Sequence, residues 1–222
     1  MTEWRVQVGD DEVSATLDEA MGGESRGVFV CAHGAGGNKS DRGMLSAAST
    51  LRRRGLDVVR FNFPYTEKKS HRPDRMPLLQ DSVSAVVAHT RQQLRPSKLF
   101  IGGRSMGGRA ASMLAAEGFA ADGLILLAYP LHPAGRPEQL RAAHLSQITM
   151  PVLALSGTRD ALCTRELMEK ALRDVPAPWE MHWIEGADHS FHVLKRSGRT
   201  DADVLKEIGD TAERWLTELN AR

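Results

Sequence analysis

The sequence is poor in cysteine, and its two cysteines, Cys31 and Cys163, lie far apart in a chain of 222 residues. Cys31 falls inside an apolar stretch typical of a buried strand. A disulfide framework is therefore excluded, and we expect two free thiols in a reducing compartment, which points to the cytoplasm.

Long apolar runs are also missing. No run approaches the length of a transmembrane helix, and the first residues, Met-Thr-Glu-Trp-Arg-Val, lack the apolar core of a signal peptide. The formal net charge is only +1, so the whole molecule does not attract nucleic acid or a membrane surface by charge. Internal repeats and low-complexity segments are absent as well. We therefore expect a cytoplasmic protein with neither nucleic-acid nor membrane partners.

What the sequence does contain is a regular alternation of apolar runs and amphipathic segments. With 41% hydrophobic and 26% charged residues, 222 residues suit one α/β domain spanning residues 1–222. The alternation at Trp4–Val8 and Glu12–Asp18 predicts a β-hairpin. Further strands are expected at Gly27–Ala32, Leu56–Phe63, Leu99–Ile101, Leu124–Ala128, Val152–Ser156 and Glu180–Ile184. Helices are expected at Met44–Arg54, Leu78–Leu94, Arg165–Arg173 and Asp203–Leu219.

Strands that alternate with helices predict a mostly parallel sheet covered by helices on both faces. Only two segments are candidates for a small cap over it. One is Pro64–Pro77, a polar, basic loop. The other is Pro130–Met150, in which Glu138–His144 is expected to form a short helix.

The segment around Ser105 carries the strongest chemical signal. The apolar strand Leu99–Ile101 leads into Gly-Arg-Ser-Met-Gly at 103–107, and helix-forming residues follow at once. A strand, a sharp turn and a helix are the context of the Gly-x-Ser-x-Gly nucleophile elbow. Its glycines avoid clashes with the neighbouring strand and helix. A glycine-rich connection, or a loop that binds phosphate, is the less specific alternative.

Two further polar residues follow predicted strands in the order of an α/β-hydrolase triad: Ser105, then Asp160, then His189. His189 can take the serine proton near neutral pH, and Asp160 can orient the imidazole and stabilise its cation. Asp188 is also an acid, but as the chain neighbour of His189 its side chain points away from the ring. We expect Asp188 to accept backbone N–H bonds in the turn instead. Each residue alone has a structural explanation, such as a loop cap or a surface histidine.

A tetrahedral oxyanion requires preorganised N–H donors. Met106, at the start of the helix after the serine, is one candidate, and Ala35 or Gly36 in the loop after Gly27–Ala32 is the other. His33, which opens that loop, is explained equally well as a residue that caps the strand. We expect neither a metal nor a cofactor.

On these motifs the chain resembles a small, nearly capless member of the α/β-hydrolase superfamily, of the dienelactone-hydrolase-like group. The segments Arg60-Phe-Asn-Phe-Pro-Tyr, Arg72-Pro-Asp-Arg-Met-Pro, Tyr129-Pro-Leu-His-Pro and Gly157-Thr-Arg-Asp are similar to those of a subfamily of uncharacterised predicted hydrolases. That subfamily includes a testis-expressed protein and the hydrolase-like domain of a chromatin acetyltransferase-complex subunit. The resemblance implies the fold and the triad roles of Ser105, Asp160 and His189, but no substrate. Dienelactone hydrolase uses a cysteine where this chain has Ser105, so its lactone chemistry is not implied.

These features favour a serine hydrolase that cleaves an ester, thioester or similar acyl bond of a small soluble substrate. A binding or scaffold protein that retains the fold, and an acyltransferase with the same triad, are the alternatives. The intact triad with its glycine-rich oxyanion loop favours an enzyme.

Several basic residues lie near the predicted site and could favour a negatively charged substrate. Lys68, Lys69 and Arg72 in the Pro64–Pro77 loop are candidate contacts to an acidic substrate, although a solvated loop explains them as well. Arg104 and Arg109 flank the serine, and we expect them to form structural ion pairs.

Overall fold

Eight strands form one sheet in the computed structural model, which describes residues 1–221. Their order across the sheet is β1-β2-β4-β3-β5-β6-β7-β8. The β1–β2 hairpin is antiparallel and most other pairs are parallel, as expected from the sequence. The antiparallel β2–β4 pair, which joins the hairpin to the sheet, was not predicted. The strands are β1 (Thr2–Val8), β2 (Asp11–Asp18), β3 (Val28–Ala32), β4 (Asp57–Phe61), β5 (Leu99–Arg104), β6 (Gly123–Leu127), β7 (Val152–Gly157) and β8 (Trp179–Ile184).

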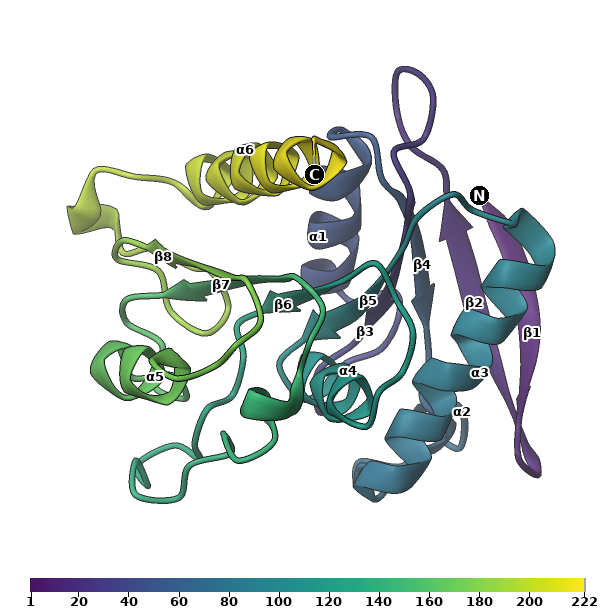
Figure 1. The fold of residues 1–222 in the computed structure, drawn as a ribbon, viewed down its shortest axis with the longest axis horizontal. Coiled ribbons are helices and arrows are strands. Elements are labelled where there is room, and N and C mark those ends of the chain that lie inside the picture. The colour runs from purple at the N-terminus through teal and green to yellow at the C-terminus, as the bar shows by residue number, and fades with distance from the viewer. Residues whose placement is uncertain (222) are drawn as a thin grey trace.

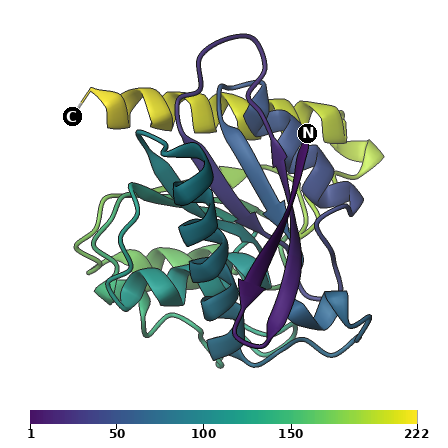
Figure 2. The ribbon, with the colours of Figure 1, turned by 90° about the vertical axis from the view of Figure 1, so that its right-hand side faces the viewer.

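Helices cover both faces of this sheet, which confirms the expected layers (Figure 1). On one face lie α1 (Arg42–Arg52) and α6 (Asp201–Asn220). On the other lie α3 (Met76–Leu94), α4 (Met106–Ala116) and α5 (Arg165–Leu172). Seen from the β1–β2 edge in Figure 2, the hairpin stands in front of the sheet, and α6 crosses above it.

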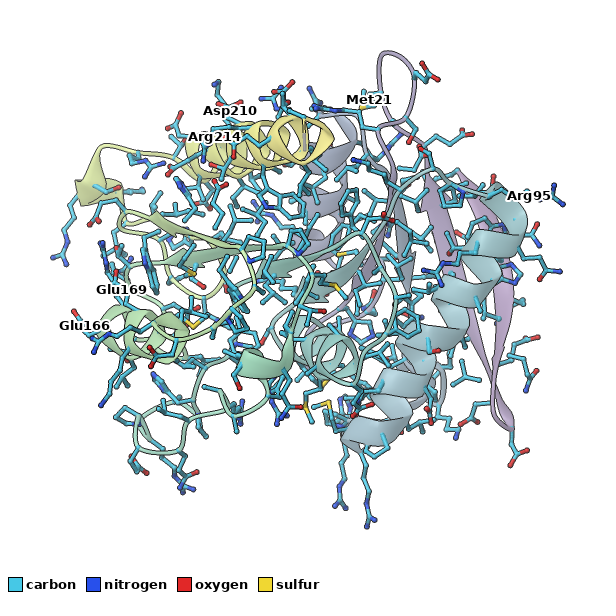
Figure 3. All side chains as sticks on the ribbon, viewed as in Figure 1. Met21, Arg95, Glu166, Glu169, Asp210 and Arg214 are labelled. Atoms are coloured by element: carbon cyan, nitrogen blue, oxygen red, sulfur yellow. The ribbon has the colours of Figure 1, made fainter. Side chains whose placement is uncertain are left out.

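The core is divided by the sheet into two apolar layers. Strands β3, β6 and β7 are buried along their whole lengths, and β5 is buried up to Arg104, as near-continuous apolar runs predict for central parallel strands. Phe29 and Phe100 face α1 and α6, whereas Val30 and Ile101 face α3 and α4. Charged side chains lie on the outer faces of the helices, for example Glu166 and Glu169 on α5 and Asp210 and Arg214 on α6 (Figure 3).

Two local expectations were wrong. The segment Glu138–His144 is not helical: it is a series of turns, and only Leu145–Gln147 forms a single 3₁₀ turn, η1. Its backbone bonds to distant residues instead, since the Arg141 N–H donates to the Leu131 carbonyl at 2.7 Å. The other error concerns Pro64–Pro77, which contains the short helix α2 (Pro64–Glu67) and the start of α3. The Asp74 carboxylate caps α2 by accepting from the Tyr65 N–H at 2.8 Å.

The connections at the carboxyl ends of β6 and β8 contain no α-helix. The chain between β6 and β7 holds only turns and η1, and a second 3₁₀ turn, η2 (Lys195–Ser197), precedes α6. Within residues 1–221, no helix is both long enough and apolar enough to cross a membrane.

Candidate active site

Ser105 occupies a strained turn between β5 and α4. Its backbone dihedrals are φ 48° and ψ −116°, outside the ordinary regions for a residue with a side chain. Such a conformation costs about 1–3 kcal/mol and persists only where its surroundings fix it. Here the Ser105 N–H donates to the Leu127 carbonyl at 2.9 Å, and its own carbonyl accepts from the Arg109 N–H at 3.0 Å. The strand, turn and helix expected around the serine are present.

The glycines of the turn are required by close backbone contacts. A Cβ on Gly107 would lie 2.5 Å from the Ala32 carbonyl oxygen and 2.6 Å from that of His33. A Cβ on Gly103 would also collide with the Ala32 carbonyl, and its φ of 147° disfavours other residues. Strand β3 therefore lies directly against the elbow, and only glycine fits between them.

His189 connects Ser105 to Asp160. Its Nε2 lies 2.9 Å from Ser105 Oγ, and its Nδ1 lies 2.8 Å from Oδ2 and 2.9 Å from Oδ1 of Asp160. This network assigns the proton of the neutral ring to Nδ1, which leaves the Nε2 lone pair to accept the serine proton. The three residues follow three different strands, β5, β7 and β8, and converge at the carboxyl edge of the sheet.

Asp160 and His189 differ in the exposure of their side chains. The Asp160 side chain is fully buried, whereas the His189 side chain is 26% exposed. Asp160 also accepts from the Leu162 N–H at 2.8 Å, which fixes its rotamer. A buried, bonded acid beside an open imidazole suits proton transfer at Nε2.

Asp188 has the role expected of it. Its Oδ1 accepts from the Ser190 N–H at 2.8 Å and from the His192 N–H at 3.1 Å. Its side chain therefore shapes the turn that presents His189, and Asp160 is the acid that contacts the imidazole.

The three candidate oxyanion donors lie in two segments beside Ser105. Met106 is the first residue of α4, where a helix leaves its N–H groups unpaired. Ala35 and Gly36 belong to the loop after β3, and that loop contacts the elbow: a Cβ on Gly34 would lie 3.4 Å from Ser105 Cβ. In the chain as far as residue 221, the N–H groups of Met106 and Ala35 have no hydrogen-bond acceptor.

His33 fixes this loop, a role that the sequence did not reveal. Its ring is fully buried; Nδ1 bonds to the Gly34 carbonyl at 2.8 Å, and Nε2 accepts from the Phe63 N–H at 3.2 Å. Burial lowers the pKa of this imidazole, so it is held neutral. His33 thereby ties the loop after β3 to the end of β4. The Lys39 N–H, which donates to Asn62 Oδ1 at 2.8 Å, ties the same loop at a second point.

The expected ion pairs of Arg104 and Arg109 are not found. Neither guanidinium lies within ion-pair distance of a carboxylate in the described chain. Arg104 packs over Gly43 at the start of α1 and reaches the His189 carbonyl at 3.4 Å. It also lines a cavity of about 350 Å³ between α1, α6 and the histidine turn. This cavity lies beside the Ser105–His189 pair and does not include it.

The basic residues of the Pro64–Pro77 segment do not contact the triad, although we considered them as substrate contacts. Lys68 is exposed, and its Nζ pairs with the Asp11 carboxylate of the β1–β2 hairpin at 2.8 Å. Lys69 and Arg72 are exposed. None of the three bonds to the triad residues, so a role in substrate binding stays a prediction without structural support.

Both cysteines are free, as expected, and both are buried. Burial raises the pKa of each thiol to about 12, so neither is a thiolate at neutral pH. Among residues 1–221, no three His, Cys, Asp or Glu side chains are grouped as metal ligands.

Comparisons with known proteins agree with this fold. A family model described as an alpha/beta hydrolase domain matches residues 25–217. Among solved structures, an alpha-beta serine hydrolase homologue from Coxiella burnetii has a TM-score of 0.77 at 21% identity, with 96% of each chain covered. A serine hydrolase without lid from Xanthomonas campestris has a TM-score of 0.73 at 20% identity, covering 96% of this chain and 94% of its own. A dienelactone hydrolase from Anabaena variabilis has a TM-score of 0.72 at 22% identity, covering 98% and 97%. At these identities the structures show a shared fold.

Proposed function

The chain belongs to the alpha/beta hydrolase family, and we propose that it is a serine hydrolase that cleaves the ester or thioester bond of a small soluble substrate. Ser105, His189 and Asp160 form its catalytic triad, and the reaction proceeds through an acyl-enzyme without a cofactor.

The observation that carries this proposal is the hydrogen-bonded chain from Ser105 Oγ through His189 to Asp160, with distances of 2.9 Å and 2.8 Å. A serine hydroxyl is a weak nucleophile until a base removes its proton. His189 Nε2 accepts that proton as Oγ attacks the acyl carbon, and returns it to the leaving group. Asp160 holds the proton at Nδ1 and stabilises the imidazolium that forms. Water then attacks the acyl-enzyme by the same proton transfers in reverse.

The developing oxyanion requires donors that are in place before the reaction. The unpaired N–H groups of Met106 and Ala35 meet this requirement, with Gly36 next in the same loop. The strained backbone of Ser105 and the clamped His33 loop hold the nucleophile and these donors in fixed positions.

Access to the site favours small substrates. The connection between β6 and β7, where a cap would be inserted, consists of turns and one 3₁₀ turn. The Xanthomonas campestris neighbour is described as having no lid, which supports the same arrangement here. We further propose that the chain acts in the cytoplasm, where its free thiols would stay reduced, and belongs to the predicted-hydrolase subfamily that its motifs resemble.

The proposal is tested by steady-state hydrolysis of 4-nitrophenyl acetate and a small acetyl thioester. We expect turnover by the wild type and a loss of at least about 10³-fold in kcat for Ser105→Ala and His189→Gln, by analogy with other triads. Ser146→Ala, at an exposed serine outside the site, is the control and keeps wild-type activity. No turnover by correctly folded wild type would favour a binding or scaffold role.

A further inference from the structure

Two arginines without counter-charges among residues 1–221, Arg109 on α4 and Arg141 in the segment between β6 and β7, lie on or near the helix that follows the nucleophile. Arg109 and Ser112 are three residues apart on α4, so their side chains lie along one stripe of the helix. The Arg109 N–H donates to the Ser105 carbonyl at 3.0 Å, which places Arg109 one turn from the nucleophile. Long helical side chains lean toward the preceding turn, which brings the Arg109 guanidinium back toward Ser105. This stripe faces the segment 129–147, and η1 packs against both α4 and α5. In Figure 1 the segment lies beside these two helices.

Hydrogen bonds hold that segment against α4. Ser112 Oγ bonds to His144 Nε2 at 2.8 Å, and the Tyr129 hydroxyl donates to the Arg141 carbonyl at 2.7 Å. The Arg141 N–H donates in turn to the Leu131 carbonyl at 2.7 Å. The backbone at Arg141 is therefore fixed from two sides, and its guanidinium lies close enough to Arg109 for the two charges to interact.

These arginines lack counter-charges. In the described part of the chain neither guanidinium forms an ion pair or a hydrogen bond, and Nε of Arg109 is buried without an acceptor. Partial burial lowers the pKa of Arg109, and the charge of Arg141 acts in the same direction. Burial and Arg109 also lower the pKa of His144 to about 4, so this ring is neutral. Two like charges thus sit together with a buried donor unsatisfied, a cost that an anionic ligand would remove.

We propose that Arg109 and Arg141 bind an anionic group of the substrate, a carboxylate or a phosphate, beside the acyl group attacked by Ser105. Guanidinium groups present paired N–H donors that match the two oxygens of such an anion. This inference rests on the proposed hydrolase function and narrows its substrate class to acyl esters or thioesters that carry a second, charged end.

The geometry also limits the length of that substrate. Four residues of α-helix rise about 6 Å, and the leaning Arg109 side chain shortens this separation. A carboxylate three to four bonds from the scissile carbonyl fits this separation. Monoesters of succinate and glutarate have that form.

The test compares mono-4-nitrophenyl glutarate with 4-nitrophenyl pentanoate, which has the same chain length but no charge. We expect the wild type to prefer the anionic ester in kcat/KM. The preference should fall at least about tenfold in Arg109→Gln and in Arg141→Gln, mainly through KM. Arg136→Gln, at an exposed arginine of the same segment, is the matched control and should keep the wild-type preference. An equal preference in all four proteins would overturn the anion site.

Binding is measured separately, so that a failure of the hydrolase proposal can be distinguished from a failure of the anion-site proposal. Isothermal titration calorimetry of glutarate into Ser105→Ala, alone and combined with Arg109→Gln or Arg141→Gln, requires no turnover. Binding that either arginine substitution weakens at least about tenfold supports the site even if both esters are inert. Absence of binding to Ser105→Ala, or binding that both substitutions leave unchanged, contradicts it. Should Arg109→Gln fail to fold, Arg141→Gln decides the question alone.

Discussion

The imidazole of His189 donates from Nδ1 to the carboxylate of Asp160, which comes from a different strand, and not to that of its chain neighbour Asp188. Both Asp160 oxygens lie within 2.9 Å of Nδ1. Asp188 instead accepts two backbone N–H bonds in the turn that carries His189. Asp160 and Asp188 therefore have separate roles: Asp160 orients the base, and Asp188 shapes the turn that carries it.

This division predicts unequal effects of the same substitution. Asp160→Asn should lower kcat by about 10⁴-fold, because the amide leaves the wrong imidazole tautomer populated. Asp188→Asn should cost far less, through a looser turn. The measurement is kcat on one activated ester, with circular dichroism to confirm that both variants are folded. A larger loss in Asp188→Asn than in Asp160→Asn would refute the assignment.

The contact between the elbow and β3 predicts that Gly107 does not tolerate a methyl group. In Gly107→Ala the new Cβ would meet two backbone carbonyls, which cannot move aside as a flexible side chain can. We expect a loss of about 1–3 kcal/mol in the free energy of unfolding and a large loss of activity. The control is Gly209→Ala in α6, whose Cβ would meet only side-chain atoms of Thr50 and Arg54, at 3.1 Å and 3.2 Å. There alanine should be neutral or stabilising by up to about 1 kcal/mol. Equal effects in urea unfolding would contradict this reading.

Buried imidazoles predict a loss of stability in acid. Burial lowers the folded-state pKa of His144 from 6.5 to about 4, and that of His33 shifts in the same direction. Below pH 6.5 the unfolded chain takes up protons that the folded chain does not bind, so the free energy of unfolding falls as the pH drops from about 6.5 toward 4. His144→Gln should flatten this decline, whereas His71→Gln, at an exposed histidine, should not. Urea unfolding at several pH values measures the slopes, and identical slopes in all three proteins would count against the prediction.

The connection between β6 and β7, which contains no α-helix, predicts an open site. Without a lid to move, the rate should rise smoothly with the concentration of a short-chain triglyceride such as tributyrin, across its solubility limit. A sharp increase in rate once an oil–water interface forms would show that some segment closes the site.

Much of this site was predictable from local sequence. The glycines around Ser105 are visible in the sequence because a tight elbow requires them. Asp160 and His189 are visible because they directly follow the apolar runs of β7 and β8, whose carboxyl ends meet at one edge of a parallel sheet. The choice of Asp160 over Asp188 followed from the opposed directions of neighbouring side chains.

The features that the sequence did not reveal depend on distant contacts. Nothing near His33 indicates that its ring will accept an N–H from Phe63, thirty residues away. The expected helix at Glu138–His144 fails because Arg141 bonds to Leu131 and Tyr129 rather than within a helix. Arg109 looked like half of an ion pair, and only the three-dimensional arrangement shows that its neighbour is another arginine. Local helix and strand propensities do not depend on contacts with residues far away in the sequence, so they cannot predict these partners.

The central claim, that Ser105 is a covalent nucleophile activated by His189, is tested most directly by labelling. The protein is treated with a fluorophosphonate, and intact-mass and peptide mass spectrometry locate the adduct. We predict one adduct per chain, on the peptide that contains Ser105, and none on folded Ser105→Ala. An unlabelled but correctly folded wild-type protein, or an adduct on any other residue, would contradict the claim.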